Sequence, residues 1–182
     1  MIKSIYRYTF LMILVNTIHL GQAQEYSKSD SPQLYLLMTV DSLSGELIDL
    51  DGEAAWNSII TANRGKAIYA NLCGTWCKGC MKSFSDVKAH RERFEDKGLN
   101  YIYIWYKSDS KEIEVLIEKY QLSGKHYFLK TEEQLKYIQN KLNNEGFPAY
   151  FLLDKKGNIF KKVAAFPSNP ESFEQIEDLL GL

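Results

Sequence analysis

The decisive stretch of this 182-residue sequence is NLCGTWCKGC, Asn71–Cys80, which contains all three cysteines of the chain. Cys77 and Cys80 have the spacing C-x-x-C, and Cys73 precedes them. Apolar residues before this stretch predict a buried strand, and the apolar spacing after it predicts a helix. Cys77 would lie at the helix N-terminus, where backbone N–H groups and the helix dipole stabilise a thiolate. Cys80 would lie one turn inward, so the pair could cycle between dithiol and disulfide.

Other uses of the cysteines are also open. The spacing C-x3-C-x2-C occurs in the cluster loop of radical S-adenosylmethionine enzymes, but the chain is short for that barrel and offers no fourth ligand nearby. Cys77 and Cys80 could instead hold zinc or copper with His90 or His126. We expect His90 on a helix surface and His126 packed in a loop or strand. A structural disulfide is the third alternative, although so short a loop constrains the unfolded chain little. Redox exchange is favoured.

Composition places the chain among ordinary globular proteins. Hydrophobic residues make up 45% of it, enough to bury a core, and its length favours one domain. The formal net charge is −1, and no run of Lys or Arg is long enough to bind a nucleic-acid backbone. We therefore expect no nucleic-acid partner.

The N-terminus has the pattern of an export signal. Lys3 and Arg7 precede a mostly apolar run at residues 8–20, and small residues follow it. We predict a signal peptide over residues 1–23, with an uncleaved membrane anchor as the alternative. The run is short and interrupted by polar residues, which argues against a membrane span. Export would place the protein in the periplasm, where disulfides persist.

Residues 24–33 are polar and expected to be a flexible lead-in to a single domain over residues 34–182. Strand and helix patterns alternate along this domain and end in a hairpin and a helix, which predicts an α/β fold with a mixed sheet flanked by helices. Gly98 is placed to end the central helix, and Gly157 takes the positive-φ position of the turn DKKGN. Strands are expected at 34–40, 47–50, 67–72, 101–105, around 128, 149–154 and 159–165, helices at 80–97, 111–120, 131–142 and 170–179, and a short helix or loop before 66.

Two segments resemble a known family. GTWCKGC, residues 74–80, resembles the strand-to-helix signature of thioredoxin-like thiol-disulfide oxidoreductases of the TlpA/ResA type, which bacteria export. GFPAYFLLDKKGNIF, residues 146–160, resembles the cis-proline loop, strand, turn and strand of the same family. The resemblance extends over about 34–182. It implies a thioredoxin-like fold with an N-terminal strand extension and a helical insertion at 106–145.

The resemblance also implies roles for particular residues. Cys77 would be the attacking thiolate, Cys80 would resolve the mixed disulfide, and Pro148 would be cis. Trp76 and Phe147 would form an apolar rim for substrates, and the backbone beside the proline would pair with an extended substrate segment. The implied activity is disulfide reduction in cysteine-containing exported proteins, with a membrane thiol-reducing partner that recycles the pair. No cofactor and no metal are expected.

Several residues depart from the family's pattern. Asn71 and Ser83 are neutral at the two positions where family members carry an acid that takes the proton of the second cysteine. Gly79 replaces a frequent proline and should alter the redox poise. Lys78 adds a positive charge beside the first cysteine. Cys73 is expected to be a small buried hydrophobe, with an auxiliary thiol as the alternative.

The main alternative function is an exported metal-binding module of the same fold. Copper-delivery relatives typically separate their two cysteines by three residues, whereas two residues separate Cys77 and Cys80. This spacing favours redox exchange. A structural domain whose pair is idle is a third hypothesis, suggested by the missing acids.

Overall fold

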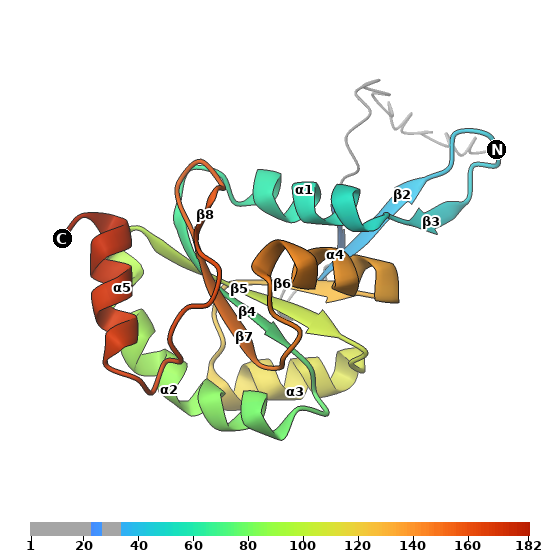
Figure 1. Ribbon diagram of the computed structural model, residues 1–182. Coiled ribbons are helices and arrows are strands. Elements are labelled where there is room, and N and C mark those ends of the chain that lie inside the picture. The colour runs from blue at the N-terminus through green and yellow to red at the C-terminus, as the bar shows by residue number, and fades with distance from the viewer. Residues whose placement is uncertain (1–22, 27–33) are drawn as a thin grey trace, which may run out of the picture.

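The computed structural model describes residues 23–26 and 34–182, so the predicted signal peptide lies outside the described residues except at its last position. The sheet has the strand order β1-β2-β6-β5-β4-β7-β8, and β3 pairs with β2 (Figure 1). Three pairings are parallel: β2 with β6, β6 with β5, and β5 with β4. The pairings of β1 with β2, β2 with β3, β4 with β7 and β7 with β8 are antiparallel. The strands are β1 Ala23–Tyr26, β2 Leu34–Val40, β3 Leu47–Asp49, β4 Ala67–Cys73, β5 Leu99–Tyr106, β6 Lys125–Leu129, β7 Ala149–Leu153 and β8 Ile159–Lys161; the helices are α1 Gly52–Ala62, α2 Lys78–Phe94, α3 Ser110–Tyr120, α4 Glu132–Leu142 and α5 Glu171–Leu180, with a 3-10 turn at Glu95–Lys97.

Helices cover both faces of the sheet (Figure 1). On one face α1 and α4 contribute Trp56 and Ile138 to one buried cluster. On the other face α2, α3 and α5 contribute Phe84, Ile113 and Ile176 to a second buried cluster. The predicted mixed sheet flanked by helices is confirmed.

Strand β4 is buried along its whole length because helices pack on both of its faces. Side chains alternate along a strand, so residues two apart share a face. Tyr69 and Cys73 belong to the cluster under α2, and Asn71, between them, faces the same layer. This layer is the one that also contains Cys80.

Some boundaries differ from those expected. The short helix or loop expected before residue 66 is a helix, α1, and the side chain of Asp51 caps its first turn by accepting from Ala54 N at 2.7 Å. Helix α2 begins at Lys78 rather than at the second cysteine of the pair. A register shift opposite Leu152 and Leu153 bends β8, which is shorter than expected.

Two glycines and the first strand complete the local features of the fold. Helix α2 ends at Phe94, and Gly98, with a φ of 86°, caps the 3-10 turn that follows it; Gly157 has a φ of 87° in its turn. Residues 23–26, around the start of the expected flexible lead-in, form β1 and pair with β2. Within the described ranges, no helix combines the length and apolar character that crossing a membrane requires.

Candidate active site

The site lies where β4 ends and α2 begins. Cys77 and Cys80 form a disulfide with their Cα atoms 5.2 Å apart. Cys77 Sγ accepts a hydrogen bond from Cys80 N at 3.1 Å, so a backbone N–H of the first helical turn points at this sulfur. The side chain of Cys77 is 6% exposed, whereas that of Cys80 is fully buried. An approaching sulfur atom can therefore reach the pair only at Cys77.

The second motif lies directly against the first. The Phe147-Pro148 peptide is cis, as the sequence predicted. A Cβ atom placed on Gly79 would lie 3.2 Å from Pro148 Cδ, which shows how closely the proline packs on the turn between the cysteines. Strand pairing explains this meeting, because Leu72 near the end of β4 pairs with Ala149 at the start of β7.

An aromatic rim surrounds the pair. Trp76 is 53% exposed, and its ring centroid lies 5.0 Å from that of Phe147 in an edge-on arrangement. Trp76 Nε1 donates to the backbone oxygen of Tyr106 at 3.0 Å. Ser108 Oγ accepts from Thr75 N at 3.0 Å and so holds the same loop. These contacts of Tyr106 and Ser108 with the site could not be predicted from the sequence, because they join residues about thirty positions apart.

A chain of hydrogen bonds connects the two neutral positions. Asn71 Nδ2 donates to Tyr150 Oη at 2.9 Å, and Ser83 Oγ lies 2.7 Å from the same Oη. Ser83 Oγ also donates to the backbone oxygen of Cys80 at 2.8 Å. Burial raises the pKa of Tyr150, so its hydroxyl is protonated at neutral pH. A role for Tyr150 was not predicted from the sequence, although side-chain alternation places it on the same face as Pro148, two residues earlier.

The third cysteine is separate from the disulfide. Cys73 has a free thiol and is fully buried. Burial raises the pKa of this thiol well above its ordinary value, because no charged partner compensates the loss of hydration. The neighbouring residues Lys78 and Gly79, by contrast, are exposed at the start of α2.

His90 and His126 form hydrogen bonds with residues other than the cysteines. His90 was expected on a helix surface, but it is fully buried, and its Nε2 lies 2.7 Å from Ser172 Oγ on α5. His126 accepts from Trp105 Nε1 at 3.1 Å through Nδ1 and so donates to Leu122 O at 3.0 Å through Nε2. Burial lowers the pKa of each histidine to about 4. Across residues 23–26 and 34–182, no three His, Cys, Asp or Glu side chains form a group that could hold a metal ion.

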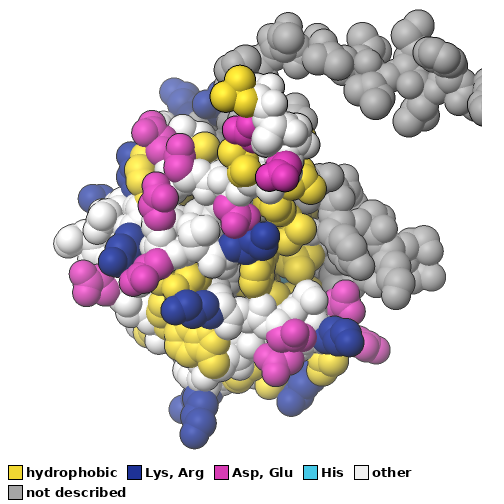
Figure 2. Space-filling view, turned by 90° about the vertical axis from the view of Figure 1, so that its right-hand side faces the viewer, with side chains coloured by type: hydrophobic (Ala, Val, Ile, Leu, Met, Phe, Trp, Pro, Cys, Tyr) yellow, Lys and Arg dark blue, Asp and Glu magenta, His cyan; other side chains and the backbone are white. Residues whose placement is uncertain are grey.

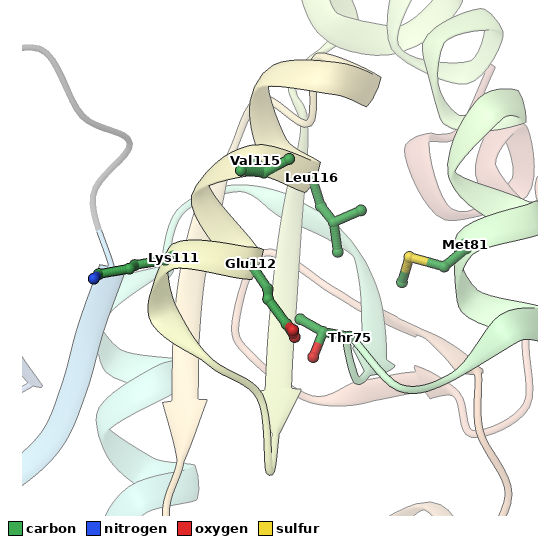
Figure 3. A pocket seen from close by; sticks show the side chains of 6 residues that line it. All are labelled: Thr75, Met81, Lys111, Glu112, Val115 and Leu116. Carbon is green, nitrogen blue, oxygen red and sulfur yellow. The ribbon is translucent and has the colours of Figure 1, made fainter.

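A groove lies beside the site, between α2 and α3 (Figure 3). Its volume is about 370 Å³. Met81 and Leu116 point toward one another across it, and Thr75 lies at one end (Figure 3). Two of its lining residues flank the cysteine pair in the sequence, because Thr75 precedes Cys77 and Met81 follows Cys80. Its lining residues are Thr75, Met81, Lys111, Glu112, Val115 and Leu116.

Comparisons with known proteins find a thioredoxin-like family and several thiol-disulfide oxidoreductases. The sequence model of a family described as thioredoxin-like matches residues 65–159. The thiol-disulfide oxidoreductase ResA of Bacillus thuringiensis subsp. konkukian is 23% identical over 185 residues, covering 98% of this chain and 95% of ResA. The thioredoxin domain of a thiol-disulfide oxidoreductase from Bacteroides vulgatus has a TM-score of 0.57 at 16% identity, covering 90% of this chain and 99% of that one. A thiol:disulfide interchange protein from Bacteroides sp. has a TM-score of 0.56 at 18% identity, covering 80% and 86%. The expected fold is confirmed.

Proposed function

This chain belongs to the thioredoxin-like family and is a thiol-disulfide oxidoreductase, and we propose that Cys77 and Cys80 are its redox centre. The observation that carries this proposal is the unequal exposure of the pair. Cys77 reaches the surface at a helix N-terminus, while Cys80 is fully buried behind it. This arrangement suits a nucleophile that meets the substrate and a resolving thiol that does not.

The proposed reaction reduces a disulfide of another protein. The Cys77 thiolate attacks one sulfur of the substrate disulfide, and the other substrate sulfur leaves as a thiolate. Cys80 then loses its proton to water or to a residue distant in sequence, and its thiolate attacks Cys77 Sγ. This second step releases the remaining substrate thiolate and forms the Cys77–Cys80 disulfide. Two electrons pass from the enzyme to the substrate, and a thiol-reducing partner must supply two electrons to restore the dithiol.

Substrate binding is proposed at the aromatic rim and the proline. The exposed ring of Trp76 on Phe147 provides an apolar surface next to Cys77. The backbone beside Pro148 can pair with an extended substrate segment in the manner of an added strand. Lys78 favours the Cys77 thiolate through its charge, and Gly79 keeps the turn narrow enough for the proline to pack on it.

The proposed location is the periplasm, and the proposed substrates are exported proteins with cysteines. Residues 1–23 would be a cleaved signal peptide, residues 24–33 a lead-in, and residues 34–182 the thioredoxin-like domain. A membrane thiol-reducing protein would recycle the pair. N-terminal sequencing of the exported protein is expected to start at Gln24. Retention of Met1 would instead indicate an anchored form.

The redox proposal is tested by equilibrating the purified protein with glutathione buffers of stepped potential and counting free thiols. We expect a reversible two-electron transition, with about 30 mV for each tenfold change in the ratio of reduced to oxidised protein. Cys77→Ser and Cys80→Ser should each abolish it, whereas Cys73→Ser, the matched control, should retain it. Absence of any transition in the unmodified protein, together with stoichiometric bound metal, would favour the metal-binding module.

A further inference from the structure

Tyr150 connects three elements around the redox pair. Its hydroxyl bonds to Asn71, on the strand before the cysteines, and to Ser83, on the helix that contains Cys80. Tyr150 itself lies on β7, the strand that follows the cis proline. All three polar side chains are at least nine-tenths buried. The hydroxyl therefore lies in a dry layer where each hydrogen must have a definite acceptor.

The direction of the hydrogen bonds follows from counting hydrogens. Ser83 Oγ carries one hydrogen and donates it to the backbone oxygen of Cys80. Tyr150 must therefore donate its own hydrogen to Ser83 Oγ. Its oxygen is then left to accept, and only the NH2 end of the Asn71 amide can donate to it. In this way Tyr150 determines which end of the amide points toward it and which end points away.

The other end of the amide is an open acceptor. Asn71 Oδ1 is buried and has no hydrogen-bond partner among the residues that the structure describes. Leaving such an oxygen unpaired is costly, so a donor is expected there in some state of the protein. In the oxidised protein Cys80 carries no hydrogen on sulfur. On reduction it gains an S–H group, and Cys80 belongs to the same buried cluster as Tyr69 and Cys73, the residues on either side of Asn71 on its face of β4.

We propose that Tyr150 is a positioning residue that presents the amide oxygen of Asn71, and not its NH2 group, to the thiol of reduced Cys80. An acceptor stabilises the protonated thiol, whereas an N–H donor would stabilise the thiolate. Cys80 therefore stays protonated while Cys77, at the helix start, is the thiolate. This inference rests on the proposed redox role of the pair.

Other titratable groups face the same layer and contribute to the pKa of Cys80 in the unmodified protein. Burial raises the pKa of the Cys73 thiol and of the Tyr103 hydroxyl, so both are neutral near pH 7. The carboxylate of Asp86 on α2 acts on Tyr150 from the helix side. These groups are retained in every variant below, so differences between variants report on the hydrogen-bond chain.

The test measures the pKa of the Cys80 thiol in the reduced protein from the 13Cβ chemical shift of labelled cysteine as a function of pH. Tyr150→Phe keeps the ring and removes the hydroxyl, which frees the Asn71 amide to turn its NH2 group toward sulfur. Ser83→Ala removes the acceptor of the Tyr150 hydrogen, which then turns to the amide oxygen and rotates the amide. Each variant should lower the pKa of Cys80 by about one unit, the effect of a single hydrogen bond.

The matched control is Tyr69→Phe. Tyr69 is a buried tyrosine of the same layer whose hydroxyl donates to Ala165 O at 2.7 Å, outside the chain. The Tyr69→Phe variant should leave the pKa of Cys80 unchanged. Thermal unfolding checks that each variant folds, and Ser83→Ala decides the matter if Tyr150→Phe does not fold.

An unchanged or raised pKa of Cys80 in the folded variants would overturn the inference, as would an equal fall in Tyr69→Phe. These results differ from failure of the proposed function. If the unmodified protein shows no reversible thiol transition in glutathione buffers, the redox proposal itself fails. If it cycles normally and Cys80 does not respond to loss of the chain, only the role of Tyr150 fails.

Discussion

The three cysteines differ in chemistry because their sulfur atoms have different surroundings. Cys77 keeps 6% of its surface exposed, and its sulfur accepts a hydrogen bond from a backbone N–H, which suits a reactive thiolate. Cys80 is fully buried behind it. Cys73 is also fully buried, at the end of β4, and this burial raises the pKa of its thiol well above the ordinary value. At the scale of single residues, solvent access separates a working thiol from a packing thiol.

Cys73 should be unreactive in the folded protein. After reduction and exposure to iodoacetamide at pH 8, we expect Cys77 to be modified at least about a hundredfold faster than Cys73. Burial excludes the reagent and keeps the pKa of the Cys73 thiol well above its ordinary value, so modification requires opening of the core. Mass spectrometry of the cysteine-containing peptides gives the rates.

The control for this experiment is the same reaction in concentrated guanidinium, where all three thiols should react at similar rates. Modification of Cys73 in the folded protein as fast as Cys77 would support its role as an auxiliary thiol instead.

At the scale of elements, the site results from the neighbouring positions of β4 and β7. The two strands are antiparallel, so the end of β4 lies beside the start of β7. The cysteine pair follows the first strand and Pro148 precedes the second, which brings the two motifs together. Helix α2 begins between them, and its first turn supplies the N–H that points at Cys77. Strand pairing alone thus assembles residues about seventy positions apart.

The N-terminal extension and the insertion support each other. Strand β6 of the insertion pairs with β2 of the extension. Helix α4 starts with a capping box in which Thr131 and Gln134 satisfy one another's backbone N–H groups. Gln134 also donates to Leu50 O at 2.8 Å and so attaches the helix to the extension. Each addition therefore buries part of its apolar surface against the other, as Leu37 and Leu135 do in one buried cluster.

At the scale of the whole molecule, charges of both signs are mixed on the face seen in Figure 2, with hydrophobic side chains between them. This pattern agrees with a net charge near zero. The charge changes with the largest consequence occur inside the protein, because His90 on α2 and His126 on β6 are both buried in neutral form. His126 packs against Trp105, and His90 packs against Phe173.

Stability should fall as the pH falls from about 6.5 to about 4. The folded protein holds the pKa of His90 and His126 at about 4, below the ordinary 6.5, so the unfolded chain binds more protons across this window. Their contribution is fully present above pH 6.5 and fully lost below pH 4. Each histidine can contribute up to about 3 kcal/mol to this loss. Urea unfolding between pH 4 and pH 8 measures it.

The variant His126→Phe removes one of the two titrations and should reduce the pH-dependent part of the unfolding free energy by about half. It should be less stable at pH 7, because Trp105 Nε1 loses its acceptor. Equal pH dependence in the variant and the unmodified protein would show that His126 is not buried in its neutral form.

The sequence by itself predicted the C-x-x-C pair that we propose as the redox centre, the cis proline and the order of strands and helices, because each depends on short-range patterns or on special residues such as Pro148. Tertiary structure alone decided how these parts meet. His90 shares the spacing of Val87 and Phe94 on the buried face of α2, yet only α5 supplies the serine that satisfies it. The chain from Asn71 through Tyr150 to Ser83 joins three separate elements. Such contacts depend on which strands become neighbours, and no local pattern encodes that.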